Sequence, residues 1–101
     1  MGIDHEGVKH LSALINLEYL NILCPGESKI SDQALKYLRN MHKLNRLIIK
    51  DGHFTDKALD YLDDLPSLIW LELTSDYAFS TKAINDFRQK NPNITELQLI
   101  P

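Results

Sequence analysis

The chain has 101 residues, with a hydrophobic share of 44%, a charged share of 25% and a formal net charge of −3. This length allows one small domain, and the composition is ordinary for a soluble globular protein. The net charge argues against a general binder of nucleic acid or of anionic membranes, because either needs a basic surface. No apolar run approaches the about 20 residues of a membrane span. The lone Cys24 and the lack of a signal-peptide pattern predict a cytoplasmic protein.

The first predicted unit covers residues 3–29. Its apolar residues recur at steps of five, three, three, three, three and two, at Ile3, Val8, Leu11, Leu14, Leu17, Leu20 and Ile22. Residues 4–14 predict a helix that begins at Asp4. The closing step of two predicts a strand over residues 17–23, since alternate strand residues face the same side.

The same pattern returns in three further units, 30–53, 54–78 and 79–101. Predicted helices cover residues 31–41, 55–65 and 80–90, and predicted strands cover residues 44–50, 68–74 and 94–100. The second and third copies keep every spacing, from Ile30, Leu35, Leu38, Met41, Leu44, Leu47 and Ile49 to Phe54, Leu59, Leu62, Leu65, Leu68, Leu71 and Leu73. The fourth copy holds one extra residue near residues 90–93. We therefore interpret the chain as one domain of four repeated helix–strand units.

Polar and small residues recur at fixed places in these units. Helix-capping residue types stand in one register, at Asp4, Ser31, Thr55 and Ser80. Asp32 and Asp56 follow, where negative charge suits the helix dipole. Small residues before the first helical leucine predict close approach of helix and sheet, at Gly7, Ala34, Ala58 and Ala83.

Residues 44–54, with the sequence LNRLIIKDGHF, resemble the leucine-rich repeat. Residues 54–73, FTDKALDYLDDLPSLIWLEL, are similar to the subclass found in F-box proteins (the cysteine-containing type) and related bacterial proteins. The family's asparagine or cysteine position instead holds Pro25, Gly52 and Asp76, so we expect its side-chain ladder to be mostly missing. The resemblance implies an α/β fold. It would be a right-handed solenoid of about four helix–strand units, with a parallel sheet on the concave face and helices on the convex one.

In such a solenoid, the outward strand residues form rows across the concave face. The alternation predicts three rows: Tyr19, Arg46, Trp70 and Glu96; Asn21, Ile48, Glu72 and Gln98; and Leu23, Lys50, Thr74 and Ile100. Trp, Tyr and Arg are enriched in binding hot spots, which favours a protein-binding site. We expect its residues to be Tyr19, Arg46, Trp70, Glu96, Ile48, Glu72 and Lys50. The alternative is that Trp70 only covers its neighbours or packs against another part of a longer protein.

These features predict a protein–protein interaction module with a protein partner. By resemblance it would be part of an intracellular receptor or adaptor, such as a ubiquitin-ligase substrate receptor or an innate-immune sensor. One alternative is a structural or assembly domain that packs on neighbouring domains or forms a homo-oligomer through the exposed edges of its first and last strands. Another is the repeat arm of a bacterial effector enzyme. Because both ends lack a capping unit, we also expect the chain to be part of a longer protein.

Catalytic, cofactor and metal sites are not expected. The histidines are scattered in sequence, at His5, His10, His42 and His53. The carboxylates Asp60, Asp63 and Asp64 fall on one predicted helix, where a solvated helix face explains them. No glycine-rich phosphate loop or nucleophile motif stands out. The chain is therefore expected not to be an enzyme.

Overall fold

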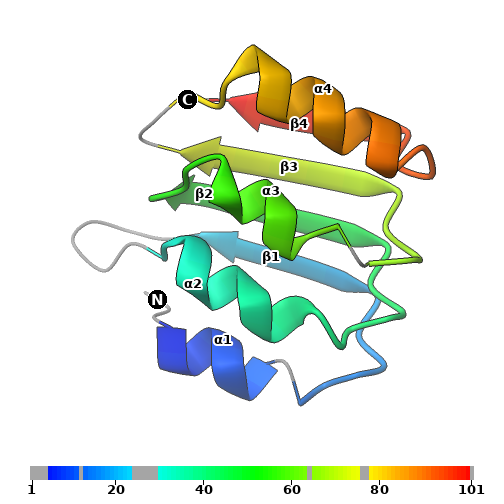
Figure 1. The fold of residues 1–101 in the computed structure, drawn as a ribbon. Helices are drawn as coiled ribbons and strands as arrows, with labels where there is room; N and C mark the ends of the chain where they lie inside the picture. The colour runs from blue at the N-terminus through cyan, green and yellow to red at the C-terminus, as the bar shows by residue number, and fades with distance from the viewer. Residues whose placement is uncertain (1–4, 12, 24–29, 64, 76–77, 101) are drawn as a thin grey trace.

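Helices and strands alternate along the chain in the computed structural model, which describes residues 5–11, 13–23, 30–63, 65–75 and 78–100 (Figure 1). In chain order the elements are α1 (His5–Leu11), β1 (Tyr19–Leu23), α2 (Asp32–Leu35), the 3-10 helix η1 (Lys36–Leu38), β2 (Arg46–Gly52), α3 (Lys57–Tyr61), β3 (Trp70–Ser75), α4 (Thr81–Lys90) and β4 (Glu96–Ile100). The strands form one parallel sheet in the order β1-β2-β3-β4. The predicted α/β class with a parallel sheet is confirmed.

The helices lie against one face of the sheet, and the core fills the space between the two layers (Figure 1). Strand residues alternate in burial because successive side chains point to opposite faces. Leu47 and Leu71 are fully buried on the helix side. Ala34 and Ala58 are fully buried as well. A small side chain at this helix position lets the backbone of the helix come close to the sheet, as the sequence predicted.

The repeated steps of three have a backbone explanation. In the second unit the N–H of Met41 donates to the Leu38 carbonyl over 3.0 Å, and the N–H of Leu44 donates to the Met41 carbonyl over 3.1 Å. Such i→i+3 bonds bring every third side chain to the same side, as in a 3-10 helix. Leu38, Met41 and Leu44 are all fully buried. The helices α1, α2 and α3 are therefore shorter than predicted, because tight turns carry part of the apolar run.

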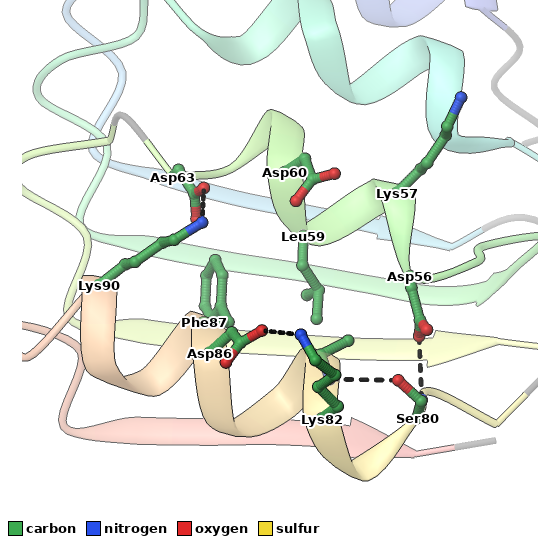
Figure 2. Close-up of a pocket in the computed structure, with 11 residues that line it drawn as sticks. Asp56, Lys57, Leu59, Asp60, Asp63, Ser80, Lys82, Asp86, Phe87 and Lys90 are labelled. Carbon is green, nitrogen blue, oxygen red and sulfur yellow. Dashed lines mark hydrogen bonds and ion pairs between the residues drawn. The ribbon is translucent and has the colours of Figure 1, made fainter.

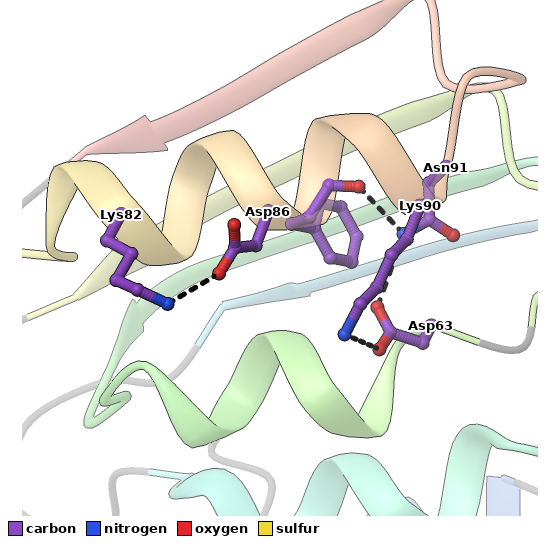
Figure 3. A network of polar contacts seen from close by, with 6 residues as sticks. Asp63, Lys82, Asp86, Lys90 and Asn91 are labelled. Carbon is purple, nitrogen blue, oxygen red and sulfur yellow. Dashed lines mark hydrogen bonds and ion pairs between the residues drawn. The ribbon is translucent and has the colours of Figure 1, made fainter.

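The fourth unit differs because of its extra residue. Its helix α4 spans Thr81–Lys90, and it ends with an i→i+4 bond of 3.0 Å from the Asn91 N–H to the Phe87 carbonyl. Asn91 is buried and takes the place that Met41 has in the second unit. Its side-chain amide donates to the Phe87 carbonyl over 2.9 Å and to Asp63 Oδ1 over 3.2 Å (Figure 3). The inserted residue thus allows a regular α-helix whose end is tied to the preceding unit.

The predicted helix caps are only partly found. Ser80 Oγ accepts the Ala83 N–H over 3.1 Å, and Thr55 Oγ1 accepts the Lys57 N–H over 3.3 Å. Ser31 makes no side-chain bond to the start of its helix. The predicted cap Asp4 lies outside the described residues.

Two aspartates join consecutive units, which the sequence did not indicate. Asp32 accepts the Thr55 N–H over 2.9 Å and also the Thr55 hydroxyl. Asp56 accepts the Ser80 N–H over 2.9 Å (Figure 2). Each carboxylate thus holds the start of the next helix, because charged acceptors bind orphan N–H groups strongly. Hydrogen bonds between units therefore exist, at positions other than the asparagine or cysteine position named in the sequence analysis.

Strand β2 extends two residues beyond the end of the predicted strand over residues 44–50. It continues to Gly52, and its register with β3 shifts between Ile49 and Gly52. Asp51 has a φ of 61°, as fits a β-bulge that inserts one extra residue. A Cβ atom at Gly52 would lie 2.2 Å from the buried ring of Phe54, so only glycine fits there without rearrangement.

The end of β3 closes back on the start of the third unit. The Ser75 hydroxyl donates to the Phe54 carbonyl and accepts the Phe54 N–H, each over 2.8 Å. All three groups are buried, so this one side chain satisfies two main-chain groups that water does not reach. Ser75 therefore fixes the connection between β2 and α3 against the end of β3.

The first unit is less buried than its pattern predicts. Leu14 is 53% exposed, whereas Met41 is 0% and Leu65 is 2% exposed at the equivalent positions. Leu14 therefore lies at the surface, although it occupies a regular place in the apolar pattern. β1 is an edge strand, and the described residues place no further unit against the side of it that faces away from β2.

Candidate functional site

The sheet face opposite the helices carries the side chains that the alternation predicted to point outward. We call this surface the open face. Its described side chains are Tyr19, Asn21, Leu23, Arg46, Ile48, Lys50, Trp70, Glu72, Thr74, Glu96 and Gln98. Among the described elements no helix covers it (Figure 1). This face of the sheet is therefore available for contact, as far as the described elements show.

The first predicted row is present in the structure. Arg46 pairs in register with Tyr19 on β1 and with Trp70 on β3, and Trp70 pairs with Glu96 on β4. Directly opposed residues on neighbouring strands come close enough for their side chains to interact. The prediction that these four side chains lie in one row is confirmed, whereas their role in binding stays a prediction.

Arg46 lies between two aromatic rings. Its guanidinium carbon is 4.5 Å from the centroid of the Trp70 ring and 5.4 Å from the centroid of the Tyr19 ring. Each distance is within the range of a cation–π interaction. Within the described residues the Arg46 side chain makes no hydrogen bond or ion pair, so its guanidinium N–H groups are not used. The rings hold the guanidinium in place and leave its donors available.

Trp70 is half-buried, and its indole N–H is unsatisfied. Its Nε1 atom is buried and has no hydrogen-bond partner in the described part of the chain. Leaving a buried donor unpaired costs about 1–3 kcal/mol, so such groups call for an explanation. Trp70 stands on β3, in register with Arg46 on β2 and with Glu96 on β4, and so lies near the middle of the open face.

In the second predicted row, the Ile48 side chain is buried, contrary to expectation. Ile48 is only 9% exposed, although it was expected to offer contact area. It lies in register between Asn21 and Glu72, whose polar side chains flank it on both sides. Glu72 is half-buried, and Gln98 donates to Glu96 Oε1 over 3.0 Å. Ile48 therefore serves as the floor of this face, below the polar groups.

The third row is interrupted by the β-bulge. Leu23 pairs with Lys50, and Thr74 pairs with Ile100, but the register shift separates Lys50 from Thr74. Lys50 is exposed at this break, while the Ile100 side chain lies outside the described residues. The predicted row therefore splits into two pairs.

Charge is divided across the open face by strand. The basic side chains Arg46 and Lys50 stand on β2, whereas the carboxylates Glu72 and Glu96 stand on β3 and β4. No ion pair joins these two groups within the described residues. The face thus has a basic part on β2 and an acidic part on β3 and β4, and Trp70 lies between Arg46 and Glu96.

A groove lies between α3 and α4, on the helix side of the molecule (Figure 2). It has a volume of about 260 Å³ and is lined by several carboxylates and lysines. Lys82 pairs with Asp86 over 3.1 Å, and Lys90 pairs with Asp63 over 3.7 Å (Figure 3). These pairs neutralise much of the local charge. We therefore interpret the groove as the hydrated boundary between two neighbouring helices.

Metal-ligating side chains are dispersed in the described part of the chain. There, no group of three or more histidine, cysteine, aspartate or glutamate residues is placed to hold a metal ion. Across the same residues, no helix has both the length and the apolar character needed to cross a bilayer. The open face, with its row of aromatic and charged side chains, is the strongest candidate site among the described surfaces.

Similarity to known proteins is found at the level of the fold. No family model matches the sequence, and no curated protein matches it. A solved structure described as "Leiomodin-1 Actin-Binding Site 2 (ABS2)" is similar, with a TM-score of 0.66 and 14% sequence identity. The match covers 97% of this chain, which spans only 63% of the length of that chain. The TM-score shows a shared fold, and at this low identity the similarity shows the fold alone.

Proposed function

We propose that this chain is a protein-binding module of the leucine-rich-repeat kind, a right-handed solenoid that recognises its partner with a concave open face. The repeated spacing of apolar residues and the consecutive order of the parallel strands support the solenoid. The setting of Arg46 between Tyr19 and Trp70 carries the functional proposal.

Three properties of this setting favour recognition of a protein. Aromatic and arginine side chains dominate binding hot spots, and here three of them stand next to one another across neighbouring strands. The guanidinium is already held in place, so binding loses little of its conformational entropy. The rings provide apolar contact area, and the unused N–H groups provide direction and specificity.

The partner is proposed to be a protein and not a nucleic acid, because the chain is net negative. By family analogy, the module would belong to an intracellular receptor or adaptor, such as a ubiquitin-ligase substrate receptor or an innate-immune sensor. The similar solved structure is described as an actin-binding site, which makes actin one partner to test.

Selection from a randomised peptide display library tests the proposal. Peptides chosen on the immobilised chain should bind Trp70→Ala and Arg46→Ala about tenfold more weakly, as is typical for loss of a hot-spot residue. Trp70→Phe should retain part of the affinity, because it keeps an aromatic ring. Arg88→Ala is the matched control, since Arg88 is an exposed arginine on α4. Selected peptides that bind all these variants equally would exclude the open face as the site.

Assembly through the first unit is the second candidate function. Leu14, Ile15 and Leu23 are each more than half exposed, and β1 is an edge strand of the sheet. Exposed strand edges with apolar neighbours favour pairing with another chain. In sedimentation experiments, concentration-dependent dimerisation that is lost in the double variant Leu14→Glu, Ile15→Glu would support assembly. Ile69→Glu is the control, because Ile69 is 50% exposed before β3. A monomer at all concentrations would reject self-association.

A further inference from the structure

The positions of the basic and acidic side chains on the open face indicate the charge pattern of its partner. We propose that the face binds an extended segment of a partner protein in which an acidic residue and a basic residue are two positions apart. The acidic side chain would contact Arg46, and the basic side chain would contact Glu72 and Glu96. This inference rests on the proposed function and adds the chemistry of the partner.

Arg46 is suited to receive a carboxylate. The rings of Tyr19 and Trp70 flank its guanidinium, at 5.4 and 4.5 Å from the ring centroids. Neither ring contact uses its guanidinium N–H groups, and no described residue accepts a hydrogen bond from them. A guanidinium that presents its edge binds a carboxylate through two parallel N–H···O bonds. An approaching acidic side chain therefore finds a donor pair that is already oriented.

Glu72 and Glu96 form the complementary part. Trp70 stands opposite Glu96, and Glu72 stands opposite Gln98, so the two carboxylates are diagonal neighbours on adjacent strands. Both are half-buried, and neither has a cationic partner among the described residues. Gln98 donates to one oxygen of Glu96, which leaves further acceptor capacity. Half-buried carboxylates without a cation favour a lysine or arginine from the partner.

Strand spacing sets the distance between the two contacts. Neighbouring strands are about 4.8 Å apart, and Glu72 is also displaced by two residues along its strand, so Glu72 and Glu96 stand about 8 and 10 Å from Arg46. In an extended segment, residues two positions apart face the same way and are separated by about 7 Å. This separation is slightly shorter than both values, and the length of a lysine or arginine side chain covers the difference, so the basic side chain reaches both carboxylates while the acidic one contacts Arg46. The Trp70 ring then lies below the intervening residue.

The partner group at Arg46 is a carboxylate and not a phosphate. A phosphate carries up to two negative charges, and Glu72 lies only one strand away from Arg46. Repulsion between these charges opposes phosphate binding, whereas one carboxylate with an adjacent cation neutralises both parts of the face.

Sequencing of the peptides selected on this chain tests the inference. Binders that lose affinity with Trp70→Ala should be enriched in an acidic and a basic residue two positions apart. Arg46→Lys should weaken the selected peptides about tenfold, because lysine lacks the planar fork. The double variant Glu72→Gln, Glu96→Gln should weaken them by a similar factor. Circular dichroism and the midpoint of thermal unfolding confirm that each variant remains folded.

A charge exchange gives the decisive comparison. The variant Arg46→Glu should reject the selected peptides and bind synthetic versions in which the acidic residue is replaced by lysine. If binders need Trp70 but show no such charge pair, this inference is overturned and the proposed function stands. If no selected binder depends on Trp70 or Arg46, the proposed function fails first. If phosphoserine at the acidic position binds more tightly than glutamate, the assignment of a carboxylate is overturned.

Discussion

The first and third helix–strand units share one apolar pattern, yet they are buried very differently. Leu65 in the third unit is 2% exposed, while Leu14 at the same place in the first unit is 53% exposed. The third unit lies between the second and the fourth, whereas β1 is at the edge of the sheet. The pattern of a repeat thus determines which side chains point inward, and neighbouring units determine whether they become buried.

The largest effect is expected when the leucine at each of these two places is replaced by alanine. Leu65→Ala should lower the free energy of unfolding by about 2–5 kcal/mol, because it leaves a cavity in a packed core. Leu14→Ala should lower it by less than about 0.5 kcal/mol, since water already reaches the side chain. Chemical denaturation measures both values. Similar losses for the two variants would show that the first unit is as well packed in solution as the third.

A smaller loss of stability is expected when the Ser75 hydroxyl at the end of β3 is removed. Ser75→Ala removes the partner of the buried Phe54 N–H and carbonyl groups. The free energy of unfolding should fall by about 1–3 kcal/mol, the cost of leaving buried polar groups unpaired. Ser67→Ala, at an exposed position, is the control and should change stability little. Faster amide exchange at Phe54 in Ser75→Ala alone would locate the effect.

The smallest effect concerns the carboxylate that joins the third unit to the fourth. Asp56→Ala removes the acceptor of the Ser80 N–H at the start of α4. The expected loss is about 0.5–1 kcal/mol, because solvent screens an exposed bond of this kind. Asp60→Ala removes a nearby exposed aspartate and is the control. Equal stability of the two variants would show that the bond between these units contributes nothing measurable.

Much of the fold follows from the sequence. The closing step of two residues in each unit predicted the strands, and their alternation predicted the register of Tyr19, Arg46, Trp70 and Glu96. The prediction of the register succeeded because successive side chains of a strand point to opposite faces. Once the apolar residues identify the buried face, the residues between them are assigned to the open face. The burial of Ala34 and Ala58 against the sheet was expected for a different reason, namely the small residue that recurs at one place in each predicted helix.

Other features depend on contacts that a local pattern does not contain. The sequence explained Asp32 and Asp56 by the favourable effect of negative charge near a helix N-terminus. Their hydrogen-bond partners, however, come from the following unit. The burial of Ile48 depends on the side chains to either side of it, and the exposure of Leu14 depends on the absence of a neighbour among the described residues. The glycine and aspartate of the β-bulge suggested a loop because they favour turns.

The order β1-β2-β3-β4 has a consequence for how such a chain changes during evolution. Each strand pairs only with strands that are adjacent in the sequence. Duplication of one helix–strand segment would therefore add a strand and leave most existing strand pairs intact. Length can then vary by whole segments, and each duplication adds new positions to the open face beside those already present. A surface of this kind can be enlarged and altered stepwise, without redesign of the core that supports it.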